Sequence, residues 1–279
     1  MKIGLSSCGK IVDEALFAAY AQAGVEAIEI SVGRERVLEG VGLSEVARLA
    51  RKYGVDLWSY HLPFPEYNLA TRDEDRRLAY VRRQSEHIRM AADMGICHYV
   101  VHPSTEPIPD EIRAVRMEQS KKSLAALTEV AGVVGGVLCV ENLPRTCLGK
   151  NSDEVLELLS SHPDLRVCFD TNHLLCEDPI RFIERVGNKI ATTHVSDYDL
   201  IDERHWLPGE GAMDWKEIYN ALCRVGYNGA WLYELGFGNT KRITRERNLT
   251  CADFSRNARE IFEGKSLTVV PHEKHEPIQ

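Results

Sequence analysis

The chain contains 279 residues, of which 44% are hydrophobic and 27% are charged, and its formal net charge is -8. This length suits one large α/β domain, and the negative charge argues against general binding to nucleic acid, which normally requires a basic surface. No apolar stretch is long enough to cross a bilayer, so no association with a membrane is predicted.

Eight short β-rich runs follow one another along the chain. Most of them are nearly continuous apolar segments, which is typical of parallel strands that are buried on both faces. The predicted strands span residues 3–7, 27–32, 55–61, 97–102, 137–141, 166–170, 190–195 and 230–234.

Helical patterns fill the segments between these strands. Three of the predicted helices end directly before a glycine, at Gly24, Gly54 and Gly95. Capping-box spacing marks helix starts at the pairs 71/74, 151/154 and 214/217, which are Thr/Glu, Asn/Glu and Asp/Glu. The three helices that end before glycines span 11–23, 43–53 and 71–94, and further helical patterns span 110–134, 179–186 and 250–262.

Eight alternations of strand and helix predict an α/β fold, a single (β/α)8 TIM barrel. A doubly wound sheet is the alternative, but it commonly carries a Gly-rich phosphate loop after the first strand. Residues 6–10 do not match G-x-G-x-x-G. We therefore predict one barrel domain over residues 1–265, followed by a C-terminal tail over residues 266–279.

The eight cysteines form no C-x-x-C pair. Cys97, Cys139 and Cys168 lie inside strand-like runs, which is typical of reduced, buried cysteines. A cytoplasmic location is therefore predicted.

Acidic or imidazole side chains stand at the ends of four successive predicted strands. They are Glu141, Asp170, His194 and Glu234. The carboxyl ends of barrel strands meet at one face, where three carboxylates would repel one another unless a cation or a proton intervened. Oxygen ligands with one imidazole suit Mn²⁺, Mg²⁺, Co²⁺ or Zn²⁺, so we predict that these four residues bind one divalent ion.

Three histidines belong to the same predicted face. His61 and His102 end two further strands, and His173 follows Asp170 by three residues. A lone strand-end histidine is as often structural as functional, but three at one face favour a role in binding a substrate.

The strand ends resemble those of the xylose isomerase-like barrels, a family that includes ketose 3-epimerases, sugar-phosphate isomerases and endonuclease IV. The resemblance covers nearly the whole chain and rests on residues 140–142 (V-E-N), 169–173 (F-D-T-N-H), 194–197 (H-V-S-D) and 233–234 (Y-E). It implies that the four predicted ligands hold one ion, often Mn²⁺. It also implies that Glu141 and Glu234 flank the reacting carbon and that His173 hydrogen-bonds a substrate oxygen.

Sugar epimerisation is chemically compatible with these residue types. Removing a proton next to a carbonyl requires a base on one face and a cation near the developing enolate oxygen, and returning a proton on the other face requires an acid. We therefore predict a divalent-metal-dependent epimerase or isomerase of a sugar or sugar phosphate, closest to a ketose 3-epimerase. Glu141 and Glu234 would exchange protons through a metal-stabilised ene-diolate.

Residues 202–211, D-E-R-H-W-L-P-G-E-G, have the composition of a surface loop with a Pro-Gly turn. We predict that this loop closes the barrel mouth, with His205 and Trp206 facing the substrate. Arg204 is a further candidate for substrate binding, and would pair with a sugar phosphate or merely with Asp202. The loop also resembles an endonuclease IV stretch that carries an acidic residue and a histidine. With Glu203 and His205 at those positions, the chain approaches a three-zinc ligand set, although that family has Asp in place of Glu203.

Three other functions are compatible with this pattern. A sugar lyase or deglycosidase would use the same metal and carbanion chemistry but end in elimination. An abasic-site DNA endonuclease with several zinc ions is permitted by the histidines but opposed by the net charge and by the lack of basic recognition loops. A non-catalytic sugar-binding barrel would be expected to lack one of the two glutamates. We expect a small-molecule sugar or sugar derivative as the partner, no nucleic acid and no membrane, and a homo-oligomer is compatible with the sequence.

Overall fold

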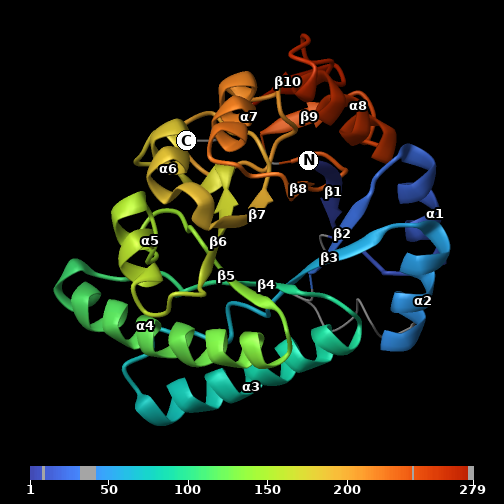
Figure 1. The fold of residues 1–279 in the computed structure, drawn as a ribbon. Coiled ribbons are helices and arrows are strands. Elements are labelled where there is room, and N and C mark those ends of the chain that lie inside the picture. Colours follow the sequence, from blue (N-terminus) through green and yellow to red (C-terminus); the bar gives the residue numbers. More distant parts are fainter. Residues whose placement is uncertain (8–9, 32–41, 241, 276–279) are drawn as a thin grey trace.

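The computed structural model describes residues 1–7, 10–31, 42–240 and 242–275. The strands of one eight-stranded sheet lie at the centre of the molecule, and helices surround them (Figure 1). The central strands are β1 (Lys2–Ser6), β2 (Ala27–Ser31), β3 (Asp56–His61), β4 (His98–Val101), β5 (Val137–Glu141), β6 (Arg166–Asp170), β7 (Ile190–His194) and β8 (Ala230–Tyr233). The helices are α1 (Glu14–Ala23), α2 (Leu43–Tyr53), α3 (Glu74–Asp93), α4 (Asp110–Val133), α5 (Ser152–Leu159), α6 (Pro179–Val186), α7 (Trp215–Arg224) and α8 (Cys251–Phe262).

Parallel pairing joins the strands in the order β7-β6-β5-β4-β3-β2-β1-β8. The two ends of this order meet through Val195, whose N–H donates to the Leu232 carbonyl at 2.8 Å and whose carbonyl accepts from the Glu234 N–H at 3.2 Å. Below Val195, the Thr193 hydroxyl donates to the Ala230 carbonyl at 2.9 Å and accepts from the Leu232 N–H at 3.4 Å. The predicted single (β/α)8 barrel is thereby confirmed.

The described strand bounds match the predicted ones to within one residue. Of the predicted positions, Val32, Cys8 and residues 276–279 lie outside the described residues. Alternation along each strand explains why the strand-end side chains point into the barrel, because residues two apart share a face. Inward-facing Cys139, Cys168 and Leu232 lie two residues before Glu141, Asp170 and Glu234. These apolar side chains therefore form the layer of the barrel interior directly beneath Glu141, Asp170 and Glu234.

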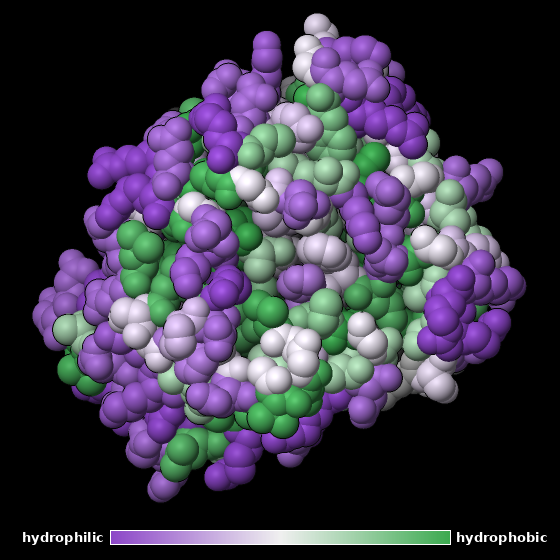
Figure 2. Space-filling view, viewed as in Figure 1, coloured by the Kyte–Doolittle hydropathy of each residue, from purple (hydrophilic) through white to green (hydrophobic). Residues whose placement is uncertain are grey.

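The main hydrophobic core lies between the strands and the helices. Phe17 from α1, Leu124 from α4 and Phe254 from α8 are fully buried against the outward-facing strand residues. On the face shown in Figure 2, hydrophilic residues dominate the periphery and more hydrophobic ones gather toward the middle. Among the described helices, none combines the length and the apolar character needed to cross a membrane.

Helix capping agrees with the sequence in part. Asn151 and Asp214 cap α5 and α7 as predicted, each accepting a hydrogen bond from the backbone three residues on. The predicted cap at Thr71 is wrong, because Asp73 accepts from the Arg76 N–H and begins α3 two residues later. The N-terminus of α8 has a full capping box between Thr250 and Asp253 that we did not predict, because Asp takes the place of the usual Glu or Gln.

Two short strands lie outside the barrel. Strand β9 (Ile243–Arg245) pairs antiparallel with β10 (His272–Lys274), so part of the predicted tail runs along the loop after β8. Among the described cysteines all are free, and Cys139 and Cys168 are buried as predicted. The prediction of a buried Cys97 is wrong, because this residue precedes β4 and is exposed.

Candidate functional site

The four predicted ligands meet at the carboxyl ends of their strands. One ligand atom from each of Glu141, Asp170, His194 and Glu234 lies within 4.8 Å of those of the other three. The Nδ1 atom of His194 is 3.1 Å from Glu234 Oε2, 3.2 Å from Glu141 Oε1 and 3.8 Å from Asp170 Oδ2. Glu141, Asp170 and His194 are almost completely buried, and the Glu234 side chain is 18% exposed.

The side-chain amide of Asn142, the residue after β5, holds the backbone of Asp170 in place. Asn142 directly follows Glu141, and its amide oxygen accepts from the Asp170 N–H at 2.8 Å while its amide nitrogen donates to the Asp170 carbonyl at 2.9 Å. Asp170 Oδ1 in turn accepts from the Asn172 N–H at 2.6 Å. One amide side chain thus fixes the spacing between the carboxylates that follow β5 and β6.

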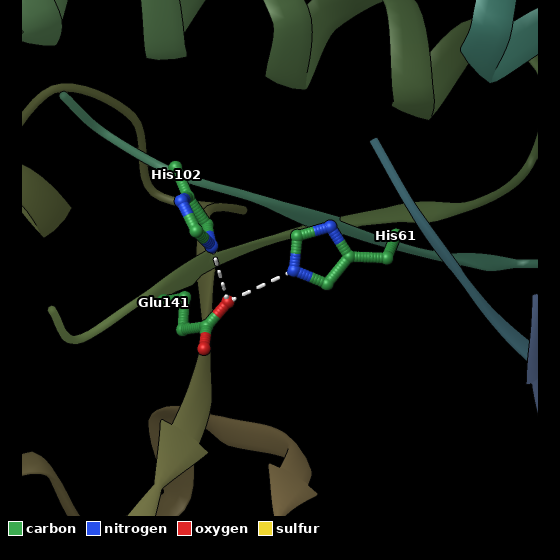
Figure 3. Close-up of side chains that lie close together, drawn as sticks. All are labelled: His61, His102 and Glu141. Atoms are coloured by element: carbon green, nitrogen blue, oxygen red, sulfur yellow. Dashed lines mark hydrogen bonds and ion pairs between the residues drawn. The ribbon is translucent and has the colours of Figure 1, made fainter. Parts of the chain in front are cut away.

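Glu141 is surrounded by imidazoles. Its Oε2 atom is 3.2 Å from the Nε2 atoms of both His61 and His102, which reach it from β3 and from the residue after β4 (Figure 3). Its Oε1 atom is 3.4 Å from His173 Nδ1. The structure therefore brings all three additional histidines to the predicted ligand set.

Three histidines at the site each have one ring nitrogen held by a backbone carbonyl. The Nδ1–H groups of His61, His173 and His205 face the backbone carbonyls of residues 62, 142 and 234 at 3.0, 3.0 and 3.1 Å. A carbonyl only accepts, so the proton must be on Nδ1, and Nε2 is left to face the carboxylates. This is the pattern of metal-binding histidines, whose second nitrogen is usually held by a carbonyl or carboxylate.

The electrostatics of the four predicted ligands also favour a bound cation. Burial raises the pKa of Asp170 to about 7, and the charges of Glu141 and Glu234 act in the same direction. Among the described residues, Asp170 Oδ2 is buried without a hydrogen-bond partner. A buried carboxylate oxygen without a partner costs free energy unless a cation satisfies it, so the donor set fits a divalent ion with oxygen and imidazole ligands.

A second group of side chains lies beside the four predicted ligands and is centred on Glu203, in the loop after β7. Glu203 Oε1 is 3.0 Å from His205 Nε2 and 3.4 Å from His173 Nε2, and the Arg145 guanidinium lies 2.9 Å from Glu203 Oε2. Arg145 and His205 both have positive φ, at 51° and 52°, an uncommon conformation for residues with a side chain. Such backbone strain persists only where surrounding contacts hold it, and here both residues bind one carboxylate.

Two predicted substrate-binding residues lie elsewhere on this loop. The Arg204 Nε donates to Asp199 Oδ2 at 2.7 Å, and the Trp206 indole N–H donates to Thr240 at 3.2 Å. Both line a groove of about 300 Å³ that also contains Ile201. A substrate contact by Arg204 or Trp206 stays a prediction, whereas His205 lies beside the cluster.

A cavity of about 220 Å³ opens next to the cluster. Phe64 and Leu143 give it an apolar side, and His102, His173 and Glu203 also line it. The Phe64 ring stacks on the His102 ring with centroids 3.8 Å apart. The cavity can therefore hold a small polar molecule with one apolar surface against the ring.

Comparison with known protein families identifies the fold and its relatives. The family described as xylose isomerase-like TIM barrel matches residues 17–249. The chain belongs to this family. The family assignment confirms the resemblance inferred from the strand ends.

Known proteins that resemble this chain include two named epimerases. Fructoselysine 3-epimerase from Shigella flexneri is 26% identical over 255 residues, which cover 84% of this chain and 90% of that protein. D-Psicose 3-epimerase from Ruminiclostridium cellulolyticum is 24% identical over 226 residues, covering 77% of this chain and 75% of its own length. A probable endonuclease 4 from Finegoldia magna is 25% identical over 173 residues, covering 56% of this chain and 60% of that protein.

A solved structure shares the fold of this chain. A D-tagatose 3-epimerase-like protein superposes with a TM-score of 0.81 at 24% identity, covering 94% of this chain and 97% of the other.

Sequence reasoning missed several residues of this site, among them Phe64, Arg145 and Glu29. Glu29, in the middle of β2, is fully buried and contacts His194 at 3.0 Å. The signal was a single carboxylate inside the apolar run Ala27-Ile28-Glu29-Ile30, where burial of a charge requires a partner.

Proposed function

We propose that this protein is a metal-dependent epimerase of a ketose or a ketose derivative. The observation that carries the proposal is the convergence of Glu141, Asp170, His194 and Glu234, whose ligand atoms lie within 4.8 Å of one another. The two named 3-epimerase relatives, which match more than three quarters of the chain, support the choice of a sugar over other substrates.

Glu234 and Glu141 would act as the proton-transferring pair. A divalent ion held by the four ligands would supply a positive charge that polarises the substrate carbonyl and so acidifies the neighbouring C–H. In the metal-free protein, burial works against ionisation of Glu234, but the charge of protonated His194 and its hydrogen bond lower the pKa of Glu234 to about 2; a bound cation would take over this role when His194 is a neutral ligand. Glu234 is therefore a carboxylate at neutral pH, free to accept the proton.

The opposite face needs a group that returns a proton. Burial acts to raise the pKa of Glu141, but the charges of His194 and His102 hold it well below its usual range. Burial lowers the pKa of His61, yet the hydrogen bond and charge of Glu141 outweigh this and raise it to about 9. With the ion held by the four ligands alone, His61 Nε2 binds no metal and can be protonated; it would then pass a proton to Glu141, which would deliver it to the carbon.

The substrate would lie in the cavity beside this cluster. Phe64 offers a flat apolar surface, and His102, His173 and Glu203 offer hydrogen-bonding groups. The Arg145 guanidinium already pairs with three carboxylates, and Arg204 pairs with two. These pairings favour a sugar without a phosphate group. The cytoplasmic location stays a prediction.

Isotope incorporation tests the proposal. The Mn²⁺-loaded protein is incubated in D₂O with a ketose panel that includes fructoselysine and D-psicose, and the products are read by NMR. We expect an epimer labelled with deuterium at the inverted carbon. Glu234→Gln should abolish the conversion, whereas Glu246→Gln, at an exposed glutamate outside the cluster, should not.

Other outcomes would direct the function elsewhere. An unlabelled epimer would indicate hydride transfer between carbons and contradict the two-carboxylate scheme. Release of a fragment from the sugar would indicate the lyase or deglycosidase. Metal analysis of Asp170→Ala completes the test, because this variant should lose the ion, and an unchanged metal content would contradict the ligand assignment.

An abasic-site endonuclease is the second candidate, favoured by one observation. Besides the predicted ligand set, His61, His102 and Glu141 form a group with metal-ligand spacing, as do His173, Glu203 and His205. The net charge of -8 opposes binding of a polyanion, so this function ranks below sugar epimerisation.

A further inference from the structure

Glu29 is a buried carboxylate that the proposed reaction does not use. It lies in the middle of β2, is fully buried, and accepts a hydrogen bond from the Ser59 hydroxyl at 2.8 Å through Oε2. The same oxygen lies 3.0 Å from His194 Nε2. Within the described part of the chain, its other oxygen has no hydrogen-bond partner. A neutral hydroxyl cannot balance a buried negative charge, so the imidazole is the main partner of Glu29.

The two ring nitrogens of His194 face different carboxylates. Nδ1 points to Glu234 and Glu141, at 3.1 and 3.2 Å, and Nε2 points to Glu29. Strand β2 is separated from β7 by β1 and β8 in the sheet order, so the Glu29–His194 contact joins strands that are not neighbours. No backbone pairing imposes this contact, which makes it a property of the two side chains.

Only one tautomer of His194 suits a metal ligand in this geometry. A neutral imidazole carries one N–H and one lone pair, and a carboxylate outside the metal centre pairs with the N–H. If Nε2–H donates to Glu29, the lone pair is on Nδ1 and points at the other three predicted ligands. The reverse tautomer would direct an N–H toward the ion.

We propose that Glu29 is a positioning residue that fixes the tautomer and the ring orientation of His194 for metal binding. The inference rests on the proposed metal centre and adds to it a residue outside the four ligands. Glu29 would act entirely through the His194 ring, because it contacts the nitrogen that faces away from the other ligands. Its effect should therefore be seen in metal affinity and in the state of one imidazole proton.

Metal affinity is the first measurement. Mn²⁺ is titrated into the metal-free full-length protein and free Mn²⁺ is followed by EPR, for wild type, Glu29→Ala and Glu29→Gln. Loss of the carboxylate should raise the Kd by about 10- to 100-fold, the range typical of groups that orient metal-binding histidines. Glu29→Gln keeps an oxygen acceptor without the charge and should be near the lower end, about tenfold. Glu26→Gln, at an exposed glutamate three residues earlier, should bind as wild type does.

The second measurement observes the imidazole proton without metal. In ¹⁵N-histidine-labelled metal-free protein, the His194 Nε2 proton should be downfield and protected from exchange in wild type and in Glu26→Gln. In Glu29→Ala it should exchange rapidly. A purely structural loss would lower the thermal midpoint but would not single out this proton. If Glu29→Ala does not fold, the isosteric Glu29→Gln carries the comparison.

The outcomes separate this inference from the proposed function. If wild type binds Mn²⁺ and both Glu29 variants bind it within about twofold of wild type, the positioning role is wrong and the metal centre stands. If wild type binds no Mn²⁺, the proposed function fails and the role of Glu29 fails with it. Weaker Mn²⁺ binding together with loss of the protected proton would establish the role.

Discussion

The buried ion pair between Glu210 and Arg245 allows a quantitative test of how the loop after β7 is held. Glu210 belongs to the Pro-Gly-Glu-Gly turn, and Arg245 ends β9. The pair is bidentate, with Nε to Oε1 and Nη2 to Oε2 both at 2.7 Å, and both side chains are 0% exposed. We predict that Arg245→Met destabilises the protein by about 3–5 kcal/mol, because it leaves the Glu210 charge buried without a partner.

The double variant distinguishes pairing from packing. Glu210→Gln alone leaves the Arg245 charge buried without a charged partner, but the new amide can still accept from the Leu207 N–H. The loss in free energy of unfolding should therefore be near the lower end of that range, about 3 kcal/mol. Glu210→Gln combined with Arg245→Met buries no charge. Its cost should therefore fall short of the sum of the single costs by at least about 2 kcal/mol.

Urea denaturation followed by circular dichroism measures these free energies of unfolding. Arg224→Met is the matched control, because its partner Glu184 is 3.4 Å away and both side chains are at least half exposed, which limits the expected change to about 1 kcal/mol or less. Single costs below about 1 kcal/mol, or costs that simply add, would refute the view that this pair is a buried charge interaction.

Three further outcomes are expected. Gly211→Ala should lower the urea midpoint, because a Cβ there would lie 2.1 Å from Asp197 Oδ1 and 2.4 Å from the Tyr198 carbonyl, and an unchanged midpoint would contradict the close approach. The hydrogen bond from Arg247 lowers the pKa of Asp253, so its stabilisation is present above the unfolded carboxyl pKa and is lost as pH falls. Asp253→Asn should therefore cost about 1 kcal/mol at pH 7 and less below about pH 4, and a difference independent of pH would argue against it. Abasic duplex DNA should not be incised in Mn²⁺ or Zn²⁺, and efficient incision without sugar conversion would favour the nuclease.

The barrel and the meeting of its strand ends could be predicted because both follow from simple periodicity. A parallel strand buried on both faces must be apolar along its length, so the polar residue at which each run stops is visible in the sequence. Glu141, Asp170 and Glu234 are such residues, and closure of the barrel brings them together.

Interactions across the barrel and within loops could not be predicted in the same way. Glu29 stands inside an apolar run, and its contact with His194 depends on the diameter of the closed sheet rather than on local spacing. Pairing of Arg204 with Asp202 was one predicted alternative to a substrate contact, but the pairing of its guanidinium with Asp199 depends on the fold of the loop. Side-chain direction in such a loop depends on backbone angles like the positive φ of His205, which the sequence does not encode as a pattern.

The seam between β7 and β8 lies directly under the predicted ligands. Val195, whose backbone closes the seam, follows His194, and the Glu234 N–H is one of its two partners. An ion bound to the side chains of His194 and Glu234 would therefore cross-link β7 and β8, the first and last strands of the sheet order. Opening the barrel between these strands would require breaking a metal–ligand bond. Hydrogen exchange at the Val195 and Glu234 amides should therefore slow when the ion binds, while the amides between β3 and β4 keep their rates. The chemistry of the site and the closure of the fold would then be one cooperative unit.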